Sequence, residues 1–109
     1  MQLMKKTAIK AAKEAGKILL HYYSKSVNAR SKGDTYNLVT AADIASDQEI
    51  IRIIKTRYPS HSLLTEESGE KINSTEYCWI IDPLDGTNNF YHRFPMFCVS
   101  VALYKNGNP

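Results

Sequence analysis

Residues 79–90, WIIDPLDGTNNF, join an apolar run directly to a turn that holds two acids. The run that leads into this turn, Tyr77–Ile81, is rich in aromatic and branched side chains, which are typical of a buried β-strand. Pro83 has no N–H to donate to a sheet, so we expect the strand to end near Asp82. Asp85 follows three residues later. The sequence therefore predicts a strand whose end presents two carboxylates in one turn.

The two carboxylates of this turn, Asp82 and Asp85, repel each other unless a proton or a cation lies between them. Together with Glu66 and a backbone carbonyl of the turn they offer only oxygen atoms, which suit Mg²⁺, Mn²⁺ or Ca²⁺ rather than zinc. The next residues offer free amides at the expected start of a helical turn, and such amides attract phosphate: Gly86, Thr87 and Asn88. The turn therefore predicts a hard cation and a phosphate bound side by side.

Two helices are expected before this turn. Apolar residues recur every three or four positions between residues 3 and 23, with Lys and Glu among them, which predicts an amphipathic helix. The polar residues 24–37 lack this periodicity and are expected to form a loop. A second helix is expected to open at Thr40, because Thr40 and Asp43 have the spacing of a capping box. Pro59 disfavours helical geometry in the residue before it and should end this helix.

Two more strands are expected around the turn. The short run Leu63–Thr65 predicts a strand that delivers two adjacent acids, Glu66 and Glu67, and the polar residues after them predict a loop. The segment Phe97–Tyr104 is apolar on both of its alternating faces, which predicts a central strand covered on both sides. The Asn-Gly pair after it is a hairpin signal without a returning strand, so we expect the fold to be incomplete in this chain.

The composition is that of a globular domain rather than a disordered chain, with 109 residues, 43% hydrophobic and 23% charged. The formal charge of +3 is spread over interspersed basic and acidic residues, so no nucleic-acid partner is indicated. No apolar stretch is long enough to cross a bilayer. Cys78 and Cys98 lie in apolar segments with no signal peptide ahead of them, which predicts reduced, buried thiols in a cytoplasmic protein.

Three segments resemble the inositol monophosphatase family of metal-dependent, lithium-sensitive phosphomonoesterases, in the order in which they occur: NLVTAAD, YPSHSLLTEES and WIIDPLDGTNNF. The resemblance covers about residues 32–103. It implies an α/β (α+β) fold, the layered α-β-α-β-α sandwich of the inositol monophosphatase and fructose bisphosphatase type. This chain would supply the N-terminal portion, namely the first helices and part of the first sheet. The resemblance also implies a homodimer for the intact protein.

The same resemblance implies the ligands of the metal. Glu66, Asp82, the carbonyl of Leu84 and Asp85 would hold two or three Mg²⁺ ions, with Asp82 shared by two of them. Glu66 and Glu67 point to opposite faces if the strand continues through them, and the family pattern selects Glu66.

The resemblance further implies the groups that act on the substrate. Gly86 and Thr87 would bind the phosphate through their backbone amides, next to Asp85 and Asn88. Thr87 and Asp43 would position the attacking water, with Glu66 counted among the catalytic acids. Lys32 matches a basic loop residue near the site.

Hydrolysis of a phosphate ester fits these roles, because it needs an activated water and cations that neutralise the entering and departing oxygens. The implied substrate is inositol monophosphate or a related small sugar phosphate. Family members carry a further metal-binding Asp in a later WDxxAG motif, and this sequence has no such motif. Residues 1–109 are therefore expected to be the N-terminal part of a single phosphatase domain, with the C-terminal part absent and no activity on their own.

Two alternatives remain open from the sequence. Phosphatases of the haloacid dehalogenase type also end an apolar strand with two acids and Gly-Thr, but their acids are one residue apart, whereas Pro83 and Leu84 separate the acids here. A non-catalytic cation-binding or assembly module would use the same acids structurally. Each of three residues also has a purely structural explanation: Asp82 as the first residue of a turn, Asp43 as a helix cap and Lys32 as a solvated side chain.

Overall fold

The computed structural model describes residues 2–25, 32–66, 69–71, 76–92 and 96–107. Two long helices come first, then three strands, a short helix and a fourth strand. Their bounds are α1 Gln2–Lys25, α2 Lys32–Arg57, β1 Ser62–Thr65, β2 Gly69–Lys71, β3 Tyr77–Asp85, α3 Thr87–Tyr91 and β4 Cys98–Lys105. Among the described residues, no helix is long and apolar enough to span a bilayer.

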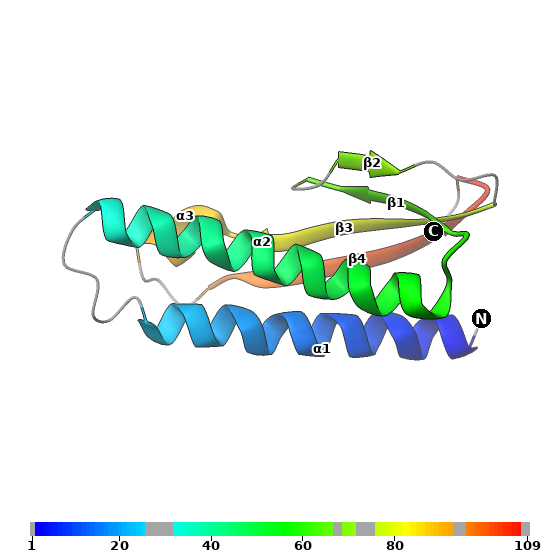
Figure 1. Cartoon of the computed structure of the whole chain (residues 1–109), viewed down its shortest axis with the longest axis horizontal. Coiled ribbons are helices and arrows are strands. Elements are labelled where there is room, and N and C mark those ends of the chain that lie inside the picture. Colours follow the sequence, from blue (N-terminus) through cyan, green and yellow to red (C-terminus); the bar gives the residue numbers. More distant parts are fainter. Residues whose placement is uncertain (1, 26–31, 67–68, 72–75, 93–95, 108–109) are drawn as a thin grey trace.

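The four strands form one mixed sheet in the order β2-β1-β3-β4. β1 and β3 run parallel, while β2 pairs antiparallel with β1 and β4 pairs antiparallel with β3. The helices α1 and α2 lie side by side against the sheet, and α3 lies at the end of the sheet farthest from the N-terminus (Figure 1). The mixed α/β architecture expected from the sequence is confirmed.

The core lies between the two long helices and the sheet. Small side chains on α1, Ala11 and Ala15, are fully buried and let α2 and the sheet approach closely. Trp79 of β3 fills the centre of this cluster and is itself fully buried. A second cluster at the α3 end is formed by Leu19, Val39, Ala42, Leu84 and Phe90. This second cluster holds the acid-bearing turn of β3 against α2.

The second helix begins earlier than predicted. It starts at Lys32, so Thr40 lies inside the helix and the predicted capping box is wrong. Packing of Val39 and Ala42 in the second cluster stabilises helical backbone ahead of Thr40. Once one turn has formed, each added residue contributes another backbone hydrogen bond. The predicted stop is confirmed, because α2 ends at Arg57, two residues before Pro59.

β3 also extends beyond its predicted end, to Asp85 instead of the neighbourhood of Asp82. The ladder with β4 is regular up to Asp82, which pairs with Ser100, and then shifts register before Asp85. Pro83 falls inside this irregular step, so the ladder needs no N–H from it. The prediction was wrong because a bulge lets a strand continue past a proline.

The outer strands differ from the predictions as well. Part of the expected polar loop after β1 forms the edge strand β2, whose ladder needs only backbone groups. β4 was expected to be central, but it is an edge strand of the described sheet and its outward side chains Cys98 and Ser100 are exposed. Its other face packs on the core through Val99 and Val101.

The cysteines are free, as predicted, but they are not buried. Cys78 is partly exposed and Cys98 is exposed, because both lie on strand positions that face away from the main core. The alternating burial of the strands, rather than their overall apolar composition, decides the environment of these thiols.

His61 is buried among aromatic rings at the other end of the core. The indole Nε1 of Trp79 donates a 3.0 Å hydrogen bond to His61 Nδ1. The His61 ring stacks on Tyr58 and Tyr77, with ring centroids 4.7 and 4.9 Å away. Burial lowers the pKa of His61 below its ordinary value of 6.5. The folded protein therefore favours the neutral imidazole.

We expect the stability of the full-length protein to fall as the pH falls through about 6.5, because the unfolded chain then binds a proton that folded His61 resists. The contribution is complete above this pH and is lost between the unfolded pKa and the lower folded pKa. Melting temperatures measured from about pH 5.5 to pH 7.5 test this. In His61→Asn, whose Oδ1 can still accept from Trp79, this pH dependence should flatten; an unchanged slope would contradict the assignment.

Candidate functional site

The acids of β1 and β3 lie at the same edge of the sheet. In the parallel pair, Thr65 is level with Ile81, so the next residues, Glu66 and Asp82, are neighbours across the two strand ends. Glu66 is exposed, while Asp82 is partly buried beside the second core cluster. Parallel pairing therefore brings together two acids that are 16 positions apart in the sequence.

The acidic turn, formed by the last residues of β3 and those that follow, is held by short-range hydrogen bonds. The Leu84 amide donates to Asp82 Oδ1 over 3.2 Å, and the Thr87 hydroxyl donates to the Leu84 carbonyl over 3.2 Å. Gly86 lies between Leu84 and Thr87 in the chain and has a φ of +89°, a conformation that favours glycine. α3 then begins at Thr87. The turn thus places two carboxylates, a carbonyl and the first amides of α3 next to one another.

α2 supplies the remaining predicted acid. Asp43 is partly buried on α2, and its neighbour Ala42 packs in the second cluster with Leu84. One turn further along, the Ser46 hydroxyl donates a 2.7 Å hydrogen bond to the Pro83 carbonyl. Asp43 therefore lies inside the helix that contacts the acidic turn, and its predicted role as a cap is excluded. Its role toward a water molecule stays a prediction.

A hollow of about 420 Å³ opens beside the turn, lined by Asp85, Gly86, Asn89, Met96, Phe97 and Cys98. Asn89 donates a 2.8 Å hydrogen bond to the Met96 carbonyl, which joins α3 to the segment that leads into β4. The Cys98 thiol contacts Asp85 Oδ2 at 3.7 Å. Partial desolvation of the sulfur, followed by the negative charge of Asp85, raises the pKa of Cys98, so the thiol stays protonated.

Sequence reasoning did not place Asn89 and Cys98 at this site. The ladder register between β3 and β4 sets Cys98 opposite Asp85 after the irregular step around Pro83. Pro83 is compatible with a bulge as well as with a strand end, but it does not specify the register that follows. The side chains of Lys32 and Asn88, both named from the sequence, lie outside the described residues. His61 accepts a hydrogen bond from the indole of Trp79.

The donor atoms of the turn fit a hard cation in kind, because carboxylate and carbonyl oxygens are what Mg²⁺ prefers. Within the described residues, no three His, Cys, Asp or Glu side chains are grouped so that they could hold a metal ion. The Leu84 carbonyl accepts from Thr87 and keeps a second lone pair. The described residues therefore provide suitable ligands at one sheet edge, without a complete coordination shell.

Solved structures share this fold. Inositol monophosphatase from Anabaena is similar with a TM-score of 0.80 and 43% identity, over 97% of this chain and 36% of that one. SaIMPase-II with inositol monophosphate bound is similar with a TM-score of 0.77 and 31% identity, over 98% of this chain and 37% of that one. SaIMPase-II with 2′AMP bound gives a TM-score of 0.79 and 30% identity, over 100% and 39%. The fold is that of the matching part of these inositol monophosphatase structures.

The sequence matches the model of the Inositol monophosphatase family over residues 1–109, so the chain belongs to this family. An inositol monophosphatase of Dictyostelium discoideum is 44% identical over 107 residues, which cover 92% of this chain and 38% of that protein. The Nus factor SuhB of Escherichia coli K12 is 41% identical over 110 residues, which cover 98% of this chain and 41% of that protein. The chain spans about two fifths of the length of these curated relatives.

Gly86→Ala should destabilise the protein more than a matched change at another glycine with positive φ. A Cβ at Gly86 would lie 2.9 Å from the Met96 carbonyl oxygen, whereas a Cβ at Gly69, with φ of +79°, would meet no atom within 4 Å. Gly69→Ala therefore carries only the conformational cost, about 1–2 kcal/mol. Denaturant unfolding of both variants of the full-length protein measures the difference, and equal losses would contradict the close approach at Gly86.

Proposed function

We propose that the full-length protein is a Mg²⁺-dependent phosphomonoesterase that hydrolyses inositol monophosphate or a related small sugar phosphate with a water molecule as nucleophile. The observation that carries the proposal is the sheet edge, where the parallel β1–β3 ladder ends at the Thr65–Ile81 pair, Glu66 and Asp82 are the next residues, and the glycine turn leads directly into α3. Membership of the inositol monophosphatase family supports the same chemistry. The related SaIMPase-II structures with inositol monophosphate and with 2′AMP support a small phosphorylated substrate.

The proposed metal ligands are Glu66, Asp82, Asp85 and the carbonyl of Leu84. When bound, Mg²⁺ supplies positive charge to the phosphate oxygens and lowers the pKa of a bound water. The protein contributes oxygen ligands on a rigid frame, because Asp82 is fixed by the Leu84 amide and Leu84 is buried. Residues outside the described part would complete the coordination.

Thr87 is proposed to orient the nucleophilic water. Its hydroxyl proton is engaged with the Leu84 carbonyl, so the hydroxyl oxygen faces other groups only as an acceptor. A water that donates to Thr87 turns a lone pair outward, and Asp43 is proposed to accept its second proton from the side of α2. This arrangement aims the water without a covalent intermediate.

The phosphate is proposed to lie against the backbone amides of Gly86 and Thr87, with Asp85 and Asn88 beside it. Gly86 follows the last residue of β3 with a positive φ, and Thr87 starts a helical turn whose first amides have no helical acceptor. We also propose, from the family resemblance alone, that the full-length protein acts as a cytoplasmic homodimer.

A substrate panel on the full-length protein tests the proposed function. The panel would contain inositol monophosphate, fructose 1,6-bisphosphate, histidinol phosphate and 2′AMP, with kcat/KM measured in Mg²⁺ and after chelation. We expect the highest kcat/KM for inositol monophosphate and loss of all turnover on chelation. Turnover that survives chelation, or preference for the nucleotide, would contradict the proposal.

Asp82→Asn should lower kcat/KM of the full-length protein to less than about a tenth, because loss of a charge that clamps the metal costs several kcal/mol in the transition state. The folded structure should persist, since the Asn oxygen can still accept from the Leu84 amide.

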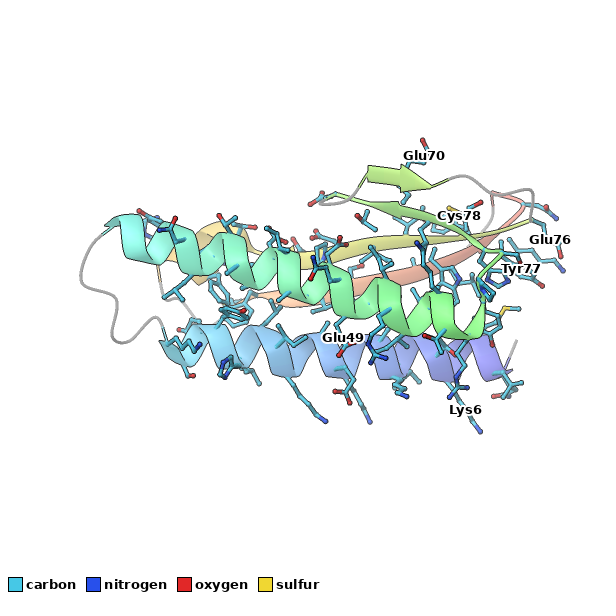
Figure 2. All side chains as sticks on the ribbon, in the orientation of Figure 1. Lys6, Glu49, Glu70, Glu76, Tyr77 and Cys78 are labelled. Carbon is cyan, nitrogen blue, oxygen red and sulfur yellow. The ribbon has the colours of Figure 1, made fainter. Side chains whose placement is uncertain are left out.

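Glu76→Gln is the matched control for this variant. It removes one negative charge just before β3, at the end of the sheet opposite α3 (Figure 2), where the side-chain amide of Asn106 donates a 3.3 Å hydrogen bond to the Glu76 carboxylate. We expect unchanged kcat/KM for Glu76→Gln. Activity of Asp82→Asn above about a tenth of the wild-type value would contradict the metal-bridging role.

A further inference from the structure

Ser46 makes a hydrogen bond that joins α2 to the acidic turn of β3. Its hydroxyl donates to the Pro83 carbonyl over 2.7 Å, between residues 37 positions apart in the chain. Ser46 and Pro83 are both fully buried. No water competes for a bond in such a place, so the bond constrains geometry more strongly than one at the surface.

The backbone around Pro83 explains why this bond is needed. Pro83 lies in the register shift of the β3–β4 ladder, and the β1–β3 ladder ends at Ile81 on the other side. Its carbonyl is therefore buried where regular sheet pairing has stopped. A buried carbonyl without a donor is costly, and the Ser46 hydroxyl takes the place of a ladder partner.

The bond also links two parts of the candidate site. Ser46 lies one helical turn after Asp43, and Pro83 lies between Asp82 and Leu84 in the turn. A single side chain thus ties the helix that carries one proposed catalytic acid to the peptide that follows the proposed metal-bridging acid. Rotation or sliding of α2 along the sheet would stretch this bond.

We propose that Ser46 is a positioning residue, which holds Asp43 in register with the Asp82–Asp85 turn through the Pro83 carbonyl. The inference rests on the proposed phosphatase function, but the register that it describes can be tested without turnover. A displacement of about 1 Å between catalytic groups can lower a rate by about a hundredfold. Ser46 is therefore expected to affect kcat more than KM.

The test compares three substitutions in the full-length protein. Ser46→Ala removes the donor, Ser46→Cys keeps the shape with a weak donor, and Ser46→Thr keeps the hydroxyl. Thr7→Ala is the matched control, because the Thr7 hydroxyl also donates to a carbonyl, that of Leu3, over 3.0 Å from a buried position. Thr7 belongs to the first turns of α1, and the N-terminal end of α1 lies at the opposite end of the molecule from α3 (Figure 1).

With inositol monophosphate in saturating Mg²⁺, Ser46→Ala should lower kcat by about tenfold or more with little change in KM. Ser46→Thr should restore most of kcat and Ser46→Cys an intermediate part, while Thr7→Ala keeps the wild-type kcat. If Ser46→Ala does not fold, a higher kcat in Ser46→Thr than in Ser46→Cys provides the same test. Wild-type kcat in Ser46→Ala, or equal kcat in the Thr and Cys variants, would overturn the proposal.

Amide hydrogen exchange supplies a readout besides activity. The Leu84 amide, which donates to Asp82 Oδ1, reports on the conformation of the turn. It should exchange faster in Ser46→Ala than in Thr7→Ala, measured at equal distance from each melting temperature. Equal exchange in the two variants would overturn the proposal even if the wild type hydrolyses no phosphomonoester, an outcome that would separately refute the proposed function.

Discussion

Parallel pairing of β1 with β3 is the constraint on which the candidate site depends. Parallel strands end at a common edge, so the acid that follows β1 meets the acid near the end of β3 although the chain separates them widely. An antiparallel arrangement would send Glu66 and Asp82 to opposite ends of the sheet. The helices α1 and α2 lie on one face of the sheet (Figure 1). The acids lie where β1 and β3 end.

Next in importance is the position of α2 on the sheet. Val39 and Ala42 pack on Leu84 and Phe90, which seats the helix against the acidic turn. The buried bond from Ser46 adds a directional contact to this non-directional packing. Apolar burial determines that α2 covers the turn, and a hydrogen bond with a required geometry can then determine its axial position.

The errors of the sequence predictions have a common origin. Pro83 and the Thr40–Asp43 pair are local signals for the end of a strand and the start of a helix, and both were overridden. A bulge absorbed Pro83 within β3, and packing on the second cluster extended α2 back to Lys32. A capping preference such as that of Thr40 is worth about 1 kcal/mol, less than the burial of one large side chain.

The sequence by itself determined that α1 is amphipathic, that α2 ends before Pro59, and that a short and a long strand each lead into acids. It also indicated the family, because the chemistry of metal and phosphate binding is concentrated in the contiguous residues 82–88. Only the tertiary structure decided that the strands leading to Glu66 and Asp82 pair in parallel, that Cys98 contacts Asp85 and that Ser46 contacts Pro83. The physical reason is that periodicity and turn chemistry act over a few residues, whereas strand register and helix seating arise from packing between distant segments.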